Sequence, residues 1–304
     1  MRILISKVLG FSYLAFVGCQ ASPINQMTSC QPLGFDEAAL RDFKTNTFEI
    51  ADERRADMAL ALIDCLGDPD PTIRDGIAYE AITSWLRSGT MLEANVRTLK
   101  DNLLTQLKTG DENGFATPFA ALVLSEVARV DRVTPYLEGE ERTAFVIEAT
   151  EHMRQIADYR GFDDTEGWRH DVAHTADWLM QLSLNENVNR DDLFKIQNAV
   201  ATQVAPISGH AYIHGESARL ARPILFMAMR GEFSEADWTA WLTKLAEPEP
   251  LENWNAAFKS ESGLARLHNT KAFLNSLYVN ASASQIENVK QLLPGTLSAL
   301  RELP

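Results

Sequence analysis

Two pairs of histidines have the spacing that could support chemistry. Four of the six histidines stand four residues apart, as His170/His174 and His210/His214. Because four residues is close to one α-helical turn, the members of each pair would share one helix face. Neighbouring imidazoles can bind a divalent metal ion or hydrogen-bond a ligand. Glycines flank the second pair, so we expect that pair to lie in a loop without a chemical role.

The first pair belongs to a longer polar stripe. At about 100° per residue, Asp177 and Gln181 follow His170 and His174 on one helix face, and Trp168 lies on the opposite, apolar face. We expect the stripe to point away from the core. Two imidazoles and a carboxylate on successive turns could ligate a divalent metal. Three interpretations stay open: a solvated polar face, a ligand-binding surface, and a metal or catalytic centre.

Two enzyme motifs are similar to this segment. His170-Asp171-Val172-Ala173-His174 resembles the zinc-protease motif His-Glu-x-x-His, with Asp in place of the catalytic Glu. Asp is shorter by a methylene, which changes its reach to a metal-bound water, so we do not predict a protease. The His170-Asp171 doublet is also similar to the HD phosphohydrolases, which need a further His and Asp on other helices. The sequence has no Gly-x-Ser-x-Gly elbow, phosphate-binding loop or dinucleotide fingerprint.

A second group of candidates lies downstream. Glu216 and Arg219 stand three residues apart at the start of a predicted helix, where we expect them to pair with each other. Glu216 is also the best candidate for a further metal ligand supplied by a neighbouring helix.

Helices must position all of these residues. From Phe35 onward apolar residues recur with a period of 3.6, and no stretch alternates as a strand would, so we predict about twelve helices and no strands. Five tryptophans at apolar helical positions are expected in the core or lining a groove: Trp168, Trp178, Trp238, Trp241 and Trp254. After two helices marked by residues 58–65 and 73–86, we expect helices at 92–107, 118–130, 140–157, 168–184, 191–204, 217–229, 235–245, 270–278 and 285–300.

The predicted fold class is all-α. Antiparallel helix pairs of about 40 residues indicate a HEAT-like array, and a closed irregular bundle is the alternative. The segment Asp70-Pro71-Thr72-Ile73-Arg74-Asp75, which opens a helix after a turn, is the most HEAT-like part of the sequence. No long linker or charge block separates two halves, so we predict a single domain over residues 35–304.

The N-terminus resembles the signal of a bacterial lipoprotein. Arg2 and Lys7 precede an apolar run at residues 8–18 that is too short to span a bilayer, which takes about 20 residues. Phe16-Val17-Gly18-Cys19 resembles a lipobox, which implies a signal peptide over 1–18, a lipid on Cys19 and a tether over 19–34. The resemblance to Gram-negative lipoproteins implies that the Gln after Cys19 directs the protein to the outer membrane, facing the periplasm. A soluble periplasmic protein cleaved after Ala21 and an uncleaved anchor are the alternatives.

Cysteine usage fits the same compartment. With Cys19 set aside, Cys30 and Cys65 remain, and an even pair in an oxidising compartment predicts a disulfide. The alternative is two unpaired thiols.

Charge limits the class of partner. The chain has 28 Lys and Arg against 42 Asp and Glu, a net charge of −14, which disfavours nucleic acid. An acidic exposed face would favour basic or neutral partners.

Several short runs form a further pattern across residues 68–229. They are Tyr159-Arg160-Gly161-Phe162, Glu166-Gly167-Trp168 with His170, Val172-Ala173-His174-x-Ala176-Asp177, Arg74-Asp75-x-Ile77-Ala78-Tyr79, Phe119-x-Ala121-Leu122-Val123-Leu124, Gly215-Glu216 and Arg219-Leu220-Ala221. Together these runs resemble a family catalogued as domain of unknown function 2785. The resemblance implies a helical fold similar to HEAT repeats and no established activity. It singles out Trp168, His170, His174, Asp177, Glu216 and Arg219.

The leading functional hypothesis is a helical-repeat binding or scaffold protein of the cell envelope, rather than an enzyme. It predicts a protein or peptide partner, no cofactor, and contact with the membrane only through the lipid anchor. The alternative is a metal-dependent hydrolase, with a divalent metal centred on His170, His174 and Asp177. A purely structural envelope protein is a third hypothesis.

Overall fold

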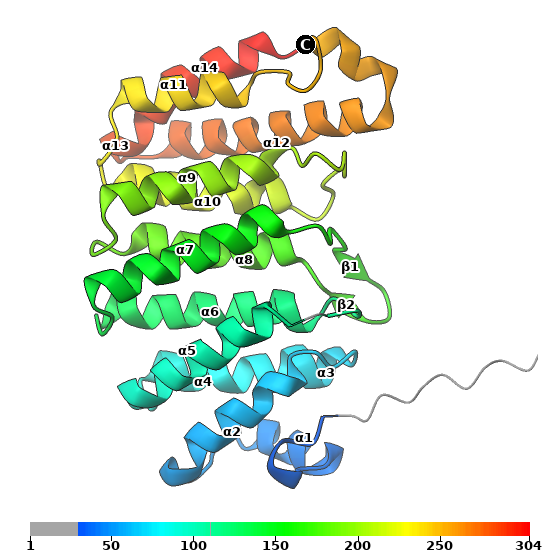
Figure 1. Ribbon diagram of the computed structural model, residues 1–304, viewed down its shortest axis with the longest axis vertical. Coiled ribbons are helices and arrows are strands. Elements are labelled where there is room, and N and C mark those ends of the chain that lie inside the picture. Colours follow the sequence, from blue (N-terminus) through cyan, green and yellow to red (C-terminus); the bar gives the residue numbers. More distant parts are fainter. Residues whose placement is uncertain (1–29, 110) are drawn as a thin grey trace, which may run out of the picture.

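A computed structural model describes residues 30–109 and 111–304 of the chain. Figure 1 shows helices stacked one above another along the long axis, from α1 and α2 at one end to α14 at the other. Within the described residues the fold is all-α apart from one small hairpin, which confirms the predicted fold class. The likeness to HEAT repeats and the single-domain boundaries at 35–304 stay predictions.

The elements follow in chain order. The N-terminal half contains η1 (Pro32–Gly34), α1 (Glu37–Thr45), α2 (Asp52–Cys65), α3 (Pro71–Ile73), the π-helical η2 (Arg74–Tyr79), α4 (Glu80–Ser88), α5 (Glu93–Leu107), α6 (Ala116–Val133) and α7 (Gly139–Gln155). After strands β1 (Phe162–Asp163) and β2 (Gly167–Trp168) come α8 (Asp171–Leu184), α9 (Arg190–Val204), α10 (Glu216–Met229), α11 (Glu235–Leu245), η3 (Trp254–Lys259), α12 (Glu261–Ala283), α13 (Glu287–Lys290) and α14 (Leu292–Glu302).

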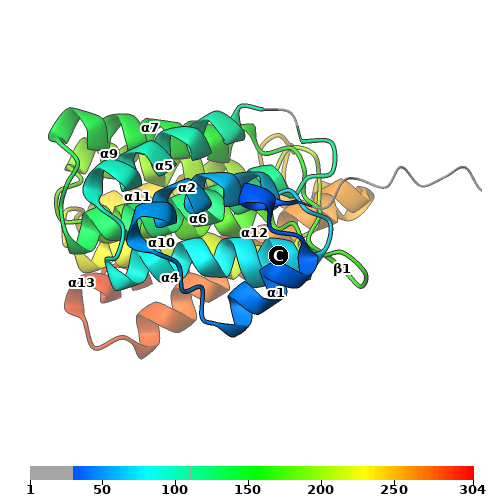
Figure 2. The same cartoon turned by 90° about the horizontal axis from the view of Figure 1, so that it is seen from below.

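The helices form two rows. In one row α4 packs against α6, α6 against α8, α8 against α10 and α10 against α12. In the other row α2 packs against α5 and α7 against α9, and α5 and α7 cover α6 and α8. Figure 2 looks along the stack and shows α2, α5, α7 and α9 on one side and α4 on the other. We call the row α4, α6, α8, α10 and α12 the inner row.

Local sequence signals set the helix ends. The chain breaks between the two helices expected from residues 58–65 and 73–86. Helix α2 ends at Cys65, and α3 begins at Pro71 with the Asp70 carboxylate accepting from the Thr72 amide at 2.8 Å. Proline fits this first helical position because its missing N–H would have no partner there. Helix α4 ends at Ser88 and is capped by Gly89, whose φ of +69° is the left-handed conformation that glycine adopts readily.

One contiguous core holds the stack together. Its buried apolar side chains run from Leu40 to Leu303. Trp178 and Trp238 are the largest fully buried side chains, and Trp254 is 8% exposed, so these tryptophans lie in the core as expected. Trp168 differs, because 36% of its surface is exposed.

The short hairpin corrects the prediction that the chain has no strands. Phe162 pairs with Trp168 and Asp163 with Gly167, and the Asp163 carboxylate closes the turn by accepting two backbone N–H groups. The helix expected at 168–184 therefore begins at Asp171. Two residues per strand are too few for alternation to be visible in the sequence, and the hairpin depends on contacts with the rest of the fold.

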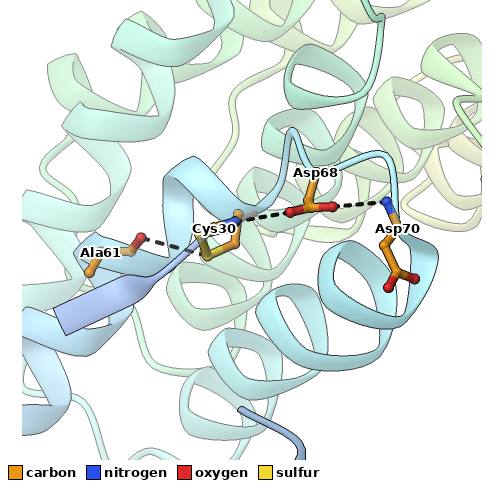
Figure 3. The surroundings of a disulfide bond; sticks show 5 residues. Cys30, Ala61, Asp68 and Asp70 are labelled. Atoms are coloured by element: carbon orange, nitrogen blue, oxygen red, sulfur yellow. Dashed lines mark hydrogen bonds between the residues drawn. A yellow bond between two sulfur atoms is a disulfide. The ribbon is translucent and has the colours of Figure 1, made fainter. Parts of the chain in front are cut away.

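A disulfide ties the N-terminal segment to the end of α2 (Figure 3). It joins Cys30 to Cys65, the pair that the cysteine count predicts, with 5.2 Å between their Cα atoms. The Asp68 carboxylate reinforces this junction, accepting from the Cys30 amide at 3.1 Å and from the Asp70 amide at 2.9 Å.

The predicted targeting features lie outside the described residues. They are the signal peptide at 1–18, the lipidated Cys19 and most of the tether at 19–34. Among the described residues no helix combines the length and the apolar character needed to cross a membrane.

Candidate ligand-binding site

The candidate residues gather where two inner-row helices begin. His170 is the residue before α8, and Gly215 is the residue before α10. The hairpin of β1 and β2 precedes α8, and in Figure 1 it projects from one side of the stack, about midway along its long axis. Helix N-termini carry partial positive charge, so the start of each of these helices favours anionic or hydrogen-bond-accepting groups.

His170 has an unusual backbone. Its φ of +61° and ψ of +39° are left-handed, a conformation that costs a residue with a Cβ roughly 1–2 kcal/mol. The surrounding chain enforces it, because the His170 amide donates to the Arg160 carbonyl at 3.1 Å and the Arg169 amide to the Gly161 carbonyl at 2.9 Å. The imidazole stacks on Trp168, with 4.7 Å between ring centroids and 17° between planes.

A buried carboxylate lies between two imidazoles. Glu216 is 2% exposed, and its Oε1 is 3.8 Å from His170 Nε2 and 3.7 Å from His214 Nδ1. Its Oε2 accepts the His214 backbone N–H at 2.9 Å. Within the described residues neither of these imidazole nitrogens has a hydrogen-bond partner.

Electrostatics favour the neutral form of His170. Burial lowers the pKa of its imidazole and outweighs the nearby Glu216 carboxylate, which raises that pKa. Arg219 and His214 add to the lowering. A neutral imidazole has one nitrogen that donates and one that accepts, so it can recognise a group that does the same.

His174 supports the site from behind. Its Nδ1 lies 3.2 Å from the Pro118 carbonyl, to which a ring N–H donates, and its ring meets the Phe119 ring edge-on at 5.1 Å. Burial, followed by the neighbouring His170, lowers the pKa of His174 to about 3. His174 is therefore a neutral side chain that joins α8 to α6.

Asp177 is held by two arginines of α10. Its carboxylate forms an ion pair with Arg219, and Arg222 Nη1 lies 3.4 Å from its Oδ1. The predicted pairing of Arg219 with Glu216 is therefore wrong. Glu216 instead contacts His170 and His214, and Arg219, one turn further along α10, faces α8.

The prediction that the stripe points away from the core is also wrong. His170 and His174 are 7% exposed and Asp177 is 9% exposed, because α8 is packed between α6 and α10. Gln181, the last residue of the stripe, accepts from Arg132 Nε of α6 at 3.0 Å. Helical periodicity identifies the polar face but not whether another helix covers it.

The proposed metal ligands do not converge. Among the described residues no group of three or more His, Cys, Asp or Glu side chains is placed to hold a metal ion. The Asp177 carboxylate contacts two arginines, and His174 Nδ1 bonds a carbonyl. The Asp of the His-Asp doublet, Asp171, bonds His152 Nε2 at 2.9 Å and the Thr175 hydroxyl at 3.1 Å, within the scaffold.

Aromatic side chains form the accessible edge of the site. Trp168 is 36% exposed and Phe162 is 48% exposed, with 4.9 Å between their ring centroids. The His214 ring meets Trp168 edge-on at 5.8 Å. The backbone of Gly161 lies against the same imidazole, since a Cβ at Gly161 would come within 2.1 Å of His214 Nδ1.

Sequence reasoning missed three members of this neighbourhood. His214 was expected to be an inert loop residue, and Arg222 and Gly161 had no assigned role. The adjacency of His214 to the Gly215-Glu216 pair is a signal that could have identified it. The three-residue spacing of Arg219 and Arg222 places both on one face of α10.

The comparison with known proteins identifies the family. No curated protein and no solved structure matches the sequence. A family model described as protein of unknown function (DUF2785) matches residues 103–279. This range starts and ends later than the expected range of 68–229. It includes every residue of the site. The match covers more than half of the chain, and the chain belongs to the DUF2785 family.

Proposed function

We propose that this protein is a ligand-binding protein of the cell envelope rather than an enzyme. Its ligand site is formed by Trp168, His170, His214 and Glu216. One observation carries the proposal: a buried imidazole nitrogen, His170 Nε2, lacks a hydrogen-bond partner among the described residues and faces a buried carboxylate beside an exposed tryptophan.

The energetic cost of this arrangement supports a binding role. A buried polar atom without a hydrogen bond costs about 1–3 kcal/mol, and the left-handed His170 backbone adds to that cost. Such costs concentrate at functional sites, where a ligand supplies the missing bonds.

The side chains indicate the ligand class. A hydroxyl group both donates and accepts, so it can donate to the Glu216 carboxylate and accept from an imidazole N–H. The exposed rings of Trp168 and Phe162 offer an apolar surface next to these polar groups. A hydroxyl-rich ligand with an apolar face, such as a sugar, meets both requirements.

The envelope location is part of the proposal. A disulfide between Cys30 and Cys65 is typical of an oxidising compartment. The lipobox-like run ending at Cys19 supports attachment through a lipid, and the Gln after it supports an outer-membrane position facing the periplasm.

Thermal shift with a panel of monosaccharides and disaccharides tests the site. We expect at least one sugar to raise the Tm of the wild type, since a ligand at 100 times its Kd adds about 2.7 kcal/mol. His170→Asn and Glu216→Gln should abolish this shift. His268→Asn, which changes an exposed histidine on α12, is the matched control and should keep it.

Two outcomes would contradict the proposal. An equal shift in the wild type and both site variants would place sugar binding elsewhere. A shift with ZnCl2 that EDTA reverses, without any shift by a sugar, would favour the metal-centre hypothesis instead.

A further inference from the structure

A second surface, formed by residues other than those of the aromatic edge of the site, is built from arginines anchored by buried carboxylates. On α4 and α6, Arg87 donates to both oxygens of Glu126, at 2.8 and 2.5 Å. The Arg87 side chain is 54% exposed and that of Glu126 is 6% exposed. The carboxylate of Glu126 is thus buried, whereas the guanidinium of Arg87 faces solvent.

The same arrangement recurs two helices further along the row. The side chain of Asp177 on α8 is 12% exposed, whereas those of its α10 partners Arg219 and Arg222 are 35% and 48% exposed. Each guanidinium has five N–H donors in a planar fork, and one carboxylate occupies only part of that fork.

Two more arginines connect these pairs. Arg129 on α6 lines a surface pocket together with Arg87. Arg132, one turn further along α6, bonds Gln181 of α8. We call Arg87, Arg129, Arg132, Arg219 and Arg222 the arginine face. Its arginines lie on α4, α6 and α10. Helix α8, which lies between α6 and α10 in the inner row, contributes their partners Asp177 and Gln181.

The charge of this face is opposite to that of the whole chain. Three of its five arginines, Arg87, Arg219 and Arg222, contact two carboxylates, those of Glu126 and Asp177, whereas the chain has 42 acidic against 28 basic residues. The expectation from net charge, a basic or neutral partner, does not describe this surface. The arginine cluster attracts an anionic group, whereas the net charge of the chain repels it.

We propose that the arginine face binds an acidic segment of a partner protein in an extended conformation. Four neighbouring helices at 8–10 Å spacing span about 24–30 Å, which an extended peptide covers with roughly eight or nine residues. Carboxylates match the planar fork of arginine. The phosphate backbone of a nucleic acid would extend beyond the arginine face, where the net charge of −14 on the chain repels it. A short acidic peptide avoids this repulsion, so we favour a peptide over nucleic acid.

Fluorescence anisotropy with a labelled ten-residue poly-glutamate peptide tests the proposal. The test variant is Arg129→Gln/Arg132→Gln/Arg222→Gln, which leaves Glu126 paired with Arg87 and Asp177 paired with Arg219. The matched control removes three exposed arginines outside this face: Arg41→Gln/Arg54→Gln/Arg301→Gln. We expect the test variant to bind the peptide at least tenfold more weakly than wild type at 50 mM salt, and the control to stay within twofold. Circular dichroism and thermal melts of each variant establish that it is folded.

Four results would overturn the proposal. They are no peptide binding by the wild type, equal loss in the test and control variants, tighter binding of a ten-nucleotide single-stranded DNA, and tighter binding of anionic phospholipid vesicles. Peptide binding by His170→Asn should equal that of wild type, so a failure here is distinguishable from a failure of the proposed ligand site.

Discussion

The guanidinium of Arg74 donates a 2.8 Å hydrogen bond from Nη2 to the carbonyl of Glu166, 92 residues later in the chain. Arg74 is fully buried, and its Nη1 also donates to the Asp68 carbonyl at 2.9 Å. Both Arg74 and Arg169 lie over the Phe115 ring, at 4.2 and 4.0 Å from its centroid. The π-helical segment thereby holds the hairpin that carries Trp168 to the site.

We expect Arg74→Met to lower the free energy of unfolding by roughly 2–4 kcal/mol. The substitution removes the donor from the buried carbonyl of Asp68 and from the partly buried carbonyl of Glu166. Urea unfolding measures the loss, and limited proteolysis should show faster cleavage at residues 162–168. Arg301→Met, at an exposed position, is the control, and a similar small loss in both variants would contradict the role of Arg74.

His174 should make the protein sensitive to acid. Its pKa is about 3 in the folded state, against about 6.5 when unfolded, so the unfolded state binds the extra proton between these values. Stability should therefore fall as the pH drops below about 6.5, by roughly 1.4 kcal/mol per pH unit from this residue. His174→Asn, whose amide N–H can still donate to the Pro118 carbonyl, should lack that part of the slope. Parallel pH-stability curves for wild type and variant would contradict the assignment.

The backbone at residue 170 gives a test that is independent of any ligand. At φ +61°, the left-handed backbone conformation raises the free energy of the folded state for alanine, which has a Cβ, but not for glycine. We expect His170→Gly to be more stable than His170→Ala by about 1 kcal/mol, although both lack the ring that stacks on Trp168. Urea unfolding of the two variants decides, and equal stabilities would show that the left-handed conformation is not enforced in solution.

Reduction of the disulfide should destabilise the N-terminal end of the stack. Cys30 and Cys65 are 35 residues apart, and closing a loop of that length stabilises by roughly 4 kcal/mol on the chain-entropy model. We expect a lower Tm in reductant, and no free thiol at either cysteine before it is added. A Cys30→Ser/Cys65→Ala variant should melt like the reduced protein, and a melt unchanged by reductant would contradict the prediction.

Cys19 tests the proposed anchor. Cys19→Ser should abolish lipid labelling and membrane fractionation while leaving the Tm of the folded part unchanged, because several acyl chains anchor stably and the folded part does not depend on them. Retention of the variant in the membrane fraction would contradict the lipid anchor. Cleavage after Ala21 in the wild type would favour the soluble periplasmic alternative.

The sequence by itself determined the all-helical fold class and three of the four residues of the site. The period of 3.6 is set by local backbone geometry, and the cap at Asp70 and the stop at Gly89 act within a turn of the chain. These signals need no tertiary contact. The family pattern likewise singled out Trp168, His170 and Glu216, which the structure brings together.

Only the tertiary structure decided what those side chains face. The amphipathic pattern of α8 does not reveal that α6 and α10 cover its polar face. His174 is therefore buried against α6, and Asp177 is the partner of Arg219 and Arg222 on α10. Net charge could not reveal an arginine face, because clustering depends on which helices are neighbours. The burial of a side chain and the identity of its partner depend on two surfaces in contact. A single sequence segment specifies only one of these two surfaces.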